Sequence, residues 1–413
     1  MSARGGAPDV VVVGAGVVGA CAAYELARAG ASVTVLERGT GWGEGCSWGN
    51  AGLLVPSHAR PIAAPESLRA GLRWMVRRDS PFGMRPQPTL APWLLRYARA
   101  STSARAAAGE ALQRTLSVEG LARFDELAAE GIDGGFRRAG CLTVHTSADG
   151  PDHAAEEAAS ETGRALGARV LTAAEARELE PALTTAVRAA VLFPDEGQCD
   201  PVRLVADVAA AAERAGATLR TGVEAGAIEQ EDGGVRVRTA VGDVRAGHAV
   251  VAAGVWSGRL AASLGEGLPL VAGKGYAVDY EPGVSPLRLP LYLYDERCVA
   301  NPMGSRLRLT GGLVLGAPEQ RGDPKRVDAI RRVAAASLGV TAAPRSTWSG
   351  LRPCTPDGLP VIGTHPRADR VVLATGHGML GVTLGPLTGR LVAGLVAGTA
   401  DHPALPRLSP ARF

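Results

Sequence analysis

The sequence predicts a two-domain protein that combines an α/β fold with an α+β fold. Near the N-terminus, strand-like and helix-like patterns alternate, as they do in a parallel sheet covered by helices. Further along, strand-like runs follow one another in an antiparallel meander. No low-complexity linker separates the two kinds of segment, so we expect the domains to be interleaved rather than arranged in series.

Length and composition exclude several classes of protein. At 413 residues, 46% apolar and 21% charged, the chain is too apolar to be disordered. The 44 basic and 41 acidic residues give a net charge of +3 without a basic block, so no nucleic-acid-binding surface is indicated. The six cysteines form no CxxC pair or His/Cys cluster, and no metal site is expected. The longest apolar stretch, Val10 to Tyr24, is too short to span a bilayer, and we expect a cytoplasmic protein.

A glycine-rich turn follows the first predicted strand. The run from Asp9 to Val13 is typical of a strand buried on both faces, and a helical pattern covers Ala20 to Ala29. Between them, Gly14 would allow the tight turn, Gly16 would let the backbone approach a pyrophosphate, and Gly19 would let the helix pack on the strand.

A carboxylate completes this motif. Glu37 ends a second strand-like run, Ser32 to Leu36, and lies 18 residues after Gly19. There it can accept hydrogen bonds from an adenosine ribose. The segment therefore predicts a site for a dinucleotide, either NAD or FAD, with a chance glycine turn as the alternative.

A second glycine-rich segment, residues 376–381, follows the predicted strand Arg370 to Thr375 and precedes a predicted helix from about Leu384 to Gly398. The chain ends 32 residues later, without a second strand to complete another nucleotide fold. We therefore expect a helix N-terminus directed at an electron-rich group, such as the N1/C2=O side of a reduced flavin.

The remaining segments carry weaker patterns. We expect mostly helix over residues 65–130, with a proline-bearing break at 80–92, and a strand at Cys141–Thr146. A helix is expected from Asp200 to Ala215, followed by a strand meander over 217–253. Further strands are expected over 268–340, with a helix at Lys325–Leu338.

Four blocks of sequence resemble the FAD-dependent D-amino-acid oxidase and dehydrogenase superfamily. They are residues 10–38, GEGCSWGNAGLL at 43–54, AVVAAGVWS at 249–257, and WSGLRPCTPDGLPVIG at 348–363 continuing into ATGHGMLGVTLGP at 374–386. The chain is most similar to D-amino-acid dehydrogenases of the small-subunit type and to glyphosate-oxidoreductase-like enzymes, which are related to glycine oxidases. The first block is common to many flavoproteins, whereas the last pair is specific to this group.

The resemblance implies a Rossmann-type FAD-binding domain interleaved with a mixed-sheet substrate domain. It places residues 1–57, 197–267 and 345–413 in the FAD-binding domain, and residues 58–196 and 268–344 in the substrate-binding domain. It also implies FAD as the cofactor. We expect this FAD to be non-covalent, because Cys354 is out of register with the flavin-linked cysteine of monomeric sarcosine oxidases.

The resemblance further implies which residues contact the cofactor. Arg38 would flank the adenine, and Val223 and Ala253 would pass near the adenosine. Residues 47 and 50–52 would line the pyrophosphate, the ribityl chain and the flavin. The complete expected set is Gly14, Gly16, Val17, Val18, Gly19, Glu37, Arg38, Ser47, Asn50, Ala51, Gly52, Leu53, Val223, Ala253, Gly254, Gly376, Gly378, Met379, Leu380, Gly381 and Thr383.

Three residues are predicted on the substrate side. Arg352 matches the arginine that binds the substrate carboxylate in glycine-oxidase-like members, a task that suits the fork of a guanidinium. His377 would face the flavin or the substrate, and Tyr276 would reach the substrate. The alternatives are a structural ion pair for Arg352, a turn position for His377 and core packing for Tyr276. Residues 311–314 lack a carboxylate that related dehydrogenases often have, which leaves the contacts of the substrate amine open.

The expected reaction is oxidation of the Cα–N bond of an amino acid, preferably a D-amino acid, by hydride transfer to flavin N5. Water would hydrolyse the resulting imino acid to a 2-oxo acid, and no protein base is needed because the flavin performs the redox step. The alternatives are oxidation of a secondary amine (an N-alkyl glycine or a proline-type ring), a dinucleotide-binding sensor without turnover, and a nicotinamide dehydrogenase. The electron acceptor, O2 or a quinone, and the oligomeric state stay open.

One segment has the composition of a surface that contacts a membrane. Residues 68–97 combine large apolar side chains with six arginines, as in amphipathic segments that contact a membrane surface. The alternative, which we favour, is a helical cover over the substrate domain. Membrane contact would make the cytoplasmic protein peripheral to the inner face of the membrane.

Overall fold

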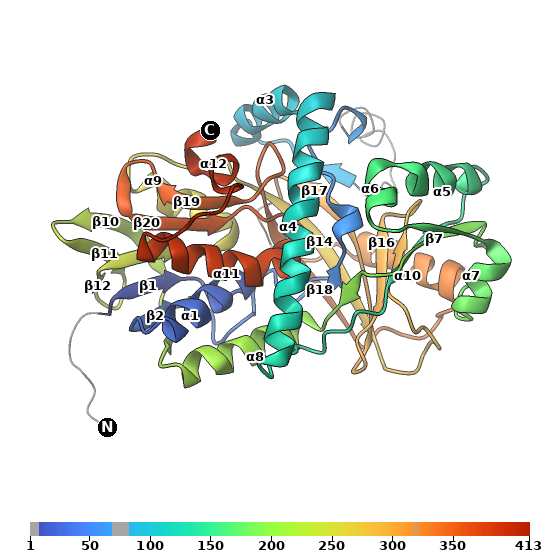
Figure 1. Cartoon of the computed structure of the whole chain (residues 1–413), viewed down its shortest axis with the longest axis horizontal. Coiled ribbons are helices and arrows are strands. Elements are labelled where there is room, and N and C mark those ends of the chain that lie inside the picture. The colour runs from blue at the N-terminus through green and yellow to red at the C-terminus, as the bar shows by residue number, and fades with distance from the viewer. Residues whose placement is uncertain (1–7, 68–81, 318, 320) are drawn as a thin grey trace.

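The structure is a computed structural model that describes residues 8–67, 82–317, 319 and 321–413. Two large sheets form the two halves of the molecule, and the long helix α4 (Ser103–Ala129) crosses their junction (Figure 1). Segments from the beginning, middle and end of the chain share the first half, as the colours of Figure 1 show. The predicted interleaving of an α/β half with a mixed-sheet half is confirmed.

The first half is built on a mostly parallel sheet, whose strand order within the described residues is β19-β20-β13-β1-β2-β9. Its strands are β1 (Val10–Val13), β2 (Val33–Leu36), β9 (Thr218–Arg220), β13 (His248–Val251), β19 (Val361–His365) and β20 (Ala368–Thr375). β1 runs parallel to both of its neighbours, β13 and β2. All four of its valines are buried, as expected for a central strand covered on both faces.

Alternate valines of β1 contact different layers. Val10 and Val12 belong to the core beneath the helices α1 (Val17–Arg28), α8 (Pro201–Arg214) and α11 (Gly381–Ala397). Val11 and Val13 belong to the core beneath α9 (Ser257–Ala262) and an antiparallel sheet of β10 (Ala225–Glu231), β11 (Gly234–Thr239) and β12 (Val244–Ala246). These layers fix the carboxyl ends of β1 and β2 next to the first turn of α1.

The second half is built on a mixed sheet, which we call the substrate sheet. Within the described residues its order is β18-β14-β17-β16-β15-β5-β7-β6, and β4 pairs with β17. Its strands are β4 (Phe82–Met84), β5 (Cys141–His145), β6 (Arg169–Thr172), β7 (Ala189–Phe193), β14 (Val271–Tyr280), β15 (Leu291–Leu293), β16 (Cys298–Pro302), β17 (Leu307–Leu315) and β18 (Ser346–Cys354). One face packs on α10 (Pro324–Leu338) and α7 (Ala173–Leu179), and the other faces the first half.

Short elements connect the halves and cover their ends. β3 (Leu53–Leu54) pairs with β8 (Gly197–Gln198) between the two sheets. The other elements are η1 (Pro56–His58), η2 (Pro88–Leu90), α3 (Ala91–Ala100), α5 (Gly150–Ala159), α6 (Glu161–Ala165), η3 (Gly254–Trp256), α12 (Leu405–Leu408) and η4 (Pro410–Arg412).

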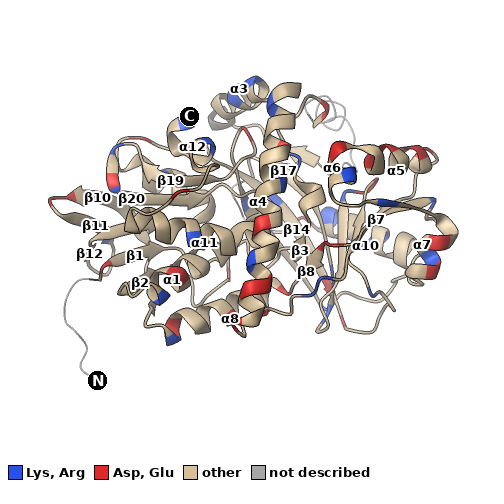
Figure 2. Cartoon of the chain, in the orientation of Figure 1, with Lys and Arg blue, Asp and Glu red and all other residues tan. Residues whose placement is uncertain are grey.

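Two segments lie in a different half from the one expected. β18 pairs with β14 along its whole length, so residues 346–354 belong to the substrate sheet and not to the FAD-binding domain. α4 was expected in the substrate domain, but Leu121 and Phe124 pack in one core with residues of α1. Arg123 of α4 is also buried and pairs with Glu25 of α1. Charges of both signs occur along the rest of α4 (Figure 2).

The predicted amphipathic segment is only partly described, since residues 68–81 lie outside the described residues. In its described part, Trp93 of α3 is buried and stacks on Tyr97, with ring centroids 5.2 Å apart. The indole Nε1 of Trp93 donates to the carbonyl of Cys354, at the end of β18, over 3.1 Å. α3 therefore covers the end of the substrate sheet. Among the described helices, none is long and apolar enough to cross a membrane.

Candidate functional site

A cavity of about 330 Å³ lies at the carboxyl ends of β1, β2, β13 and β20. This edge of a parallel sheet is where α/β proteins bind ligands. The predicted cofactor-binding residues that line it are Gly14, Gly16, Val17, Val18, Glu37, Arg38, Ser47, Asn50, Val223, Ala253, Gly254, Gly378 and Gly381. The structure thus brings together residues from the N-terminal, middle and C-terminal segments.

The glycine turn is required by close packing. Gly14 has φ +104°, and a Cβ there would lie 2.6 Å from the carbonyl oxygen of Ala252. A Cβ on Gly19 would overlap the carbonyl oxygen of Gly14. Larger residues at either position would therefore push α1 away from the sheet. α1 begins at Val17, three residues before the predicted start, so its free N–H groups point at the cavity from within the motif.

Glu37 is held by the backbone at the edge of the cavity. Its Oε2 accepts a hydrogen bond from the N–H of Ala15 (2.9 Å), and its Oε1 accepts one from Gly39 (2.8 Å). Each carboxylate oxygen keeps further lone pairs, which are available to the hydroxyls of a ribose. Next to it, the guanidinium of Arg38 lies 3.6 Å from the ring centroid of Trp256. These two residues would hold the adenosine end of a dinucleotide.

The segment 47–52, which we call the cofactor loop, forms another wall. The N–H of Val17 donates to Ser47 Oγ over 3.0 Å, which joins the loop to the start of α1. Asn50 Oδ1 accepts from the N–H of Gly52 (2.8 Å), and Asn50 Nδ2 donates to the carbonyl of Met379 (3.3 Å). The loop is therefore tied to both glycine-rich segments. Gly19, Ala51, Gly52, Leu53 and Thr383 do not line the cavity; Thr383 Oγ1 donates to the carbonyl of Leu53 behind the loop.

A smaller cavity of about 40 Å³ adjoins the first and shares His377 and Gly378 with it. Three predicted cofactor-binding residues line only this one: Gly376, Met379 and Leu380. Its other walls come from residues that were not among the predicted site residues: His58, Arg60, Pro61, Ile62, Gln113, Leu313, Cys354, Thr355 and Gly358. No Asp or Glu is among these described lining residues.

His377 stands between the two cavities. Its Nε2 lies 2.9 Å from the hydroxyl of Thr388 on α11. Burial lowers the pKa of His377 to about 4, so the imidazole is neutral at physiological pH. Burial likewise lowers the pKa of His58 to about 4, and its ring meets that of Tyr292 edge-on, with centroids 4.2 Å apart. Both imidazoles therefore present neutral groups to the smaller cavity.

Arg352 lies on the face of the substrate sheet that is turned toward the first half. Its Nη1 donates to the carbonyl of Gly312 in β17 over 2.8 Å. The guanidinium lies against Gly275 in β14, where any Cβ would overlap it. Its charge acts on the thiol of Cys46, which lines the larger cavity, and partly offsets the rise in the pKa of Cys46 caused by burial. No other hydrogen-bond partner of this guanidinium occurs among the described residues. Arg352 lines neither cavity, but its neighbours Leu351 and Pro353 line the larger one and Cys354 lines the smaller one.

Tyr276 is not brought to the cavities. Successive residues of a strand point to opposite faces, and Tyr276 lies one position after Gly275, against which Arg352 packs. Its ring is buried in the core with Ile330 and Ala334 of α10. The expected contact of Tyr276 with the substrate is therefore wrong, and core packing is the placement observed.

The fit of a dinucleotide to this site follows from these contacts. A glycine turn that tolerates no side chain leads into a helix N-terminus, and a fixed carboxylate lies at one end of the cavity. At the other end, the turn before α11 directs a second helix N-terminus at the cavity through Gly381 and Val382. α11 begins at Gly381, three residues before the predicted start.

Comparisons with known proteins agree with this geometry. A family model described as DAO, FAD dependent oxidoreductase, matches residues 9–395. A D-amino acid dehydrogenase of Paramagnetospirillum magneticum is 34% identical over 98% of each chain. A D-amino-acid oxidase of Bradyrhizobium diazoefficiens is 32% identical, also over 98% of each chain.

A solved structure is similar along the whole length. Glycine oxidase from Geobacillus kaustophilus superimposes with a TM-score of 0.78 and 29% identity, and covers 98% of this chain and 99% of its own. The predicted superfamily and the predicted FAD dependence are both confirmed by these matches. The chain belongs to the DAO family of FAD-dependent oxidoreductases.

Proposed function

We propose that this chain oxidises the Cα–N bond of a D-amino acid and that it holds FAD without a covalent bond. FAD supplies a hydride acceptor, and the imino acid product is hydrolysed by water to a 2-oxo acid. The residues that line the larger cavity would hold the cofactor, with Glu37 at one end of the cavity and Gly378 at the other. The relatives named D-amino acid dehydrogenase and D-amino-acid oxidase support this substrate class.

The observation that carries the proposal is the placement of Arg352. One of its N–H groups is fixed by the carbonyl of Gly312, and Gly275 gives the guanidinium room to lie flat on the sheet. The remaining donors can take a carboxylate with two parallel, charge-assisted hydrogen bonds. Such a bidentate contact fixes the orientation of the substrate as well as its position, so the Cα–H can be presented to the cofactor.

The smaller cavity contains no negative charge among its described lining residues, and Arg60 is the charged residue among them. His58 and His377 are neutral there, and no carboxylate occurs among the described lining residues. A bound substrate carboxylate therefore meets no negative charge. His58 and His377, with pKa values of about 4, are weak bases, so the substrate amine would lose its proton to solvent before oxidation. This chain's residues would act by binding, orientation and exclusion of water.

An anaerobic absorbance titration tests the proposal. The purified protein is mixed with D-amino acids, L-amino acids and N-alkyl glycines in turn, and the flavin absorbance is followed. We expect the absorbance to bleach with D-amino acids. Bleaching by N-alkyl glycines or proline alone would instead establish a secondary-amine oxidase, and no bleaching with any compound would contradict the proposal.

The same samples address the electron acceptor. Relatives include proteins named as a dehydrogenase and as an oxidase, so neither O2 nor a quinone is favoured. Rapid recovery of colour on admission of air would indicate an oxidase, whereas recovery only after addition of a soluble quinone would indicate a dehydrogenase. The cytoplasmic location remains a prediction from the sequence.

A further inference from the structure

We propose that Arg308, a buried arginine of the substrate sheet, is a positioning residue for the cofactor: it holds the cofactor loop in place and so sets the affinity for the flavin half of FAD. The inference rests on the proposed use of the larger cavity by FAD. It assigns a role in cofactor binding to a side chain that does not line that cavity.

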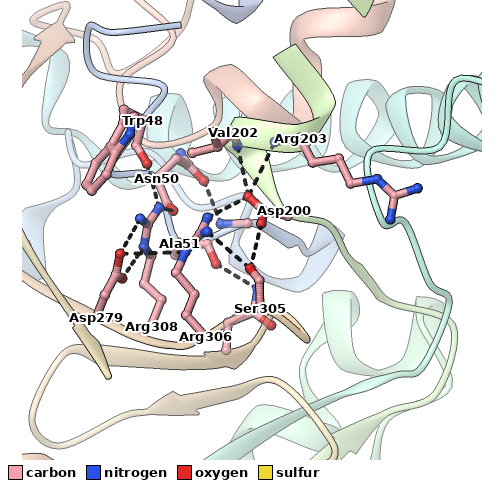
Figure 3. Close-up of polar contacts among 12 residues, drawn as sticks. Trp48, Asn50, Ala51, Asp200, Val202, Arg203, Asp279, Ser305, Arg306 and Arg308 are labelled. Atoms are coloured by element: carbon pink, nitrogen blue, oxygen red, sulfur yellow. Dashed lines mark hydrogen bonds and ion pairs between the residues drawn. The ribbon is translucent and has the colours of Figure 1, made fainter. Parts of the chain in front are cut away.

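Arg308 joins the substrate sheet to the cofactor loop through its whole guanidinium (Figure 3). Its Nε and Nη2 donate to the two carboxylate oxygens of Asp279 over 2.7 and 2.8 Å. Its Nη1 donates to the carbonyls of Trp48 (2.5 Å) and Asn50 (3.1 Å). The guanidinium also lies 4.9 Å from the ring centroid of Trp48. The side chain is fully buried, so water cannot replace these contacts.

A second side chain of the same sheet holds the next part of the loop. Asn301 Nδ2 donates to the carbonyl of Ala51 over 2.8 Å. Arg308 and Asn301 thus hold three carbonyls of the cofactor loop, those of residues 48, 50 and 51. Within the loop, the side chain of Asn50 lines the larger cavity. The shape of this wall is therefore determined by contacts made from the other half of the molecule.

The charges around Arg308 are balanced by neighbours. Asp279 also lies 3.5 Å from Nε of Arg306, and Nη2 of Arg306 donates to Asp200 over 2.6 Å. Asp200 caps the start of α8 by accepting from the N–H of Val202. Two arginines and two aspartates therefore form one neutral chain across the junction. Buried ion pairs of this kind add little net stability relative to apolar packing, so we assign this chain of charges a geometric role.

Arginine is the side chain that this arrangement requires. A planar fork can serve a carboxylate on one edge and two carbonyls on the other, whereas the ammonium of a lysine is a single point with three donors. Arg308→Lys keeps the charge opposite Asp279 but cannot reach both the carboxylate and the loop. This variant therefore separates the charge of Arg308 from its hold on the loop.

The test measures two affinities on the same holoenzyme. Release of FAD on dilution, read from flavin fluorescence, gives the FAD dissociation constant, and displacement of FAD by ADP gives that of ADP. For Arg308→Lys we expect FAD to bind about ten- to hundred-fold more weakly, the cost of hydrogen bonds from a charged donor. The affinity for ADP should change by no more than about twofold. ADP would be held by the glycine turn, Glu37 and Ser47, and neither Arg308 nor Asn301 bonds to these residues.

Controls make each outcome decisive. Arg331→Lys changes an exposed arginine of α10 that pairs with Asp328, and should leave both affinities unchanged. Asn301→Ala removes only the contact with Ala51, so FAD should weaken by about threefold to tenfold without loss of folding. The inference would be overturned if Arg308→Lys and Asn301→Ala both left the affinity for FAD unchanged. It would also be overturned if these variants lowered the affinities for FAD and ADP equally. Failure of the unmodified protein to hold FAD would instead refute the proposed function.

Discussion

The two ends of the site are built in different ways. At the proposed nucleotide end, Gly14, Gly19 and Glu37 come from one short segment, and backbone contacts within that segment, together with one to Ala252 after β13, fix the geometry. At the substrate end, Arg352 depends on Gly275 and Gly312, which lie on two other strands. A local pattern is enough to describe the first, whereas the second exists only when three strands pair in the correct register. The two ends should therefore respond independently to substitution.

The largest effect is expected at the nucleotide end. Gly19→Val would place a side chain on the carbonyl oxygen of Gly14 and displace α1 from the sheet. We expect the purified variant to contain no FAD, as measured by flavin absorbance per polypeptide. Gly226→Ala is the matched control, because a Cβ at Gly226 makes only ordinary contact with Arg238. Normal FAD content in the Gly19 variant would show that the close packing is not required.

The next largest effect is expected at the substrate end. Arg352→Ala removes the proposed carboxylate contact, so KM for the amino acid should rise about hundred-fold, as expected for loss of a charged, bidentate partner. FAD content should not change. Arg345→Ala, an exposed arginine that pairs with Glu281, serves as the control. An unchanged KM would assign carboxylate binding to another group, such as Arg60 in the smaller cavity.

A backbone substitution sharpens the same comparison. Gly275→Ala places a methyl group where the guanidinium of Arg352 lies, while Arg352 itself is retained. We expect KM to rise about tenfold because the guanidinium is displaced from its hydrogen bond to Gly312. The bound flavin should keep its absorbance spectrum. If KM stays the same in steady-state assays, the position of the arginine on the sheet does not matter.

The smallest effect is expected for the pH dependence of stability that His377, which lies between the two cavities, contributes. His377 is held neutral in the folded protein, with its pKa lowered to about 4 from an ordinary value of 6.5. Its contribution to stability is complete above about pH 6.5 and is lost as the pH falls toward about 4, because only the unfolded chain takes up the proton readily. Between about pH 7 and about pH 5 this loss should be about 2 kcal/mol.

His377→Gln provides the comparison. Urea unfolding at the two pH values should show that the variant loses less stability on acidification than the unmodified protein does. Since other groups titrate equally in both proteins, the difference isolates His377. Equal losses would mean that the imidazole is not held neutral by its surroundings.

The elements of the proposed nucleotide end can be predicted from the sequence because their determinants are local. Spacing alone identifies Gly14, Gly16, Gly19 and Glu37, and a buried run of valines is enough to identify β1. The interleaved domains also follow from the order of strand and helix patterns. Their boundaries do not, because pairing of β18 with β14 is a property of the folded sheets and leaves no mark on composition.

The substrate end shows where such prediction stops. Arg352 is predicted from its match to a family motif, and its role stays a prediction. Tyr276 packs in the core instead of reaching the cavities, because a shift of one residue along a strand moves a side chain to the opposite face. His58 and Gln113 line the smaller cavity but come from segments without a distinctive pattern, and only tertiary packing brings them there. Arg308, which holds the cofactor loop, was not among the predicted residues, because its contacts with Asp279, Trp48 and Asn50 exist only after the two halves pack together.

The most direct test is an anaerobic titration of the unmodified protein and Arg352→Ala with the same D-amino acid, at equal FAD content. The structure predicts that both proteins hold FAD and that the unmodified protein bleaches at low substrate concentration. The variant should require about hundred-fold more substrate for the same bleaching. Identical titration curves, or an unmodified protein that no D-amino acid bleaches, would contradict the assignment of Arg352 and the proposed reaction.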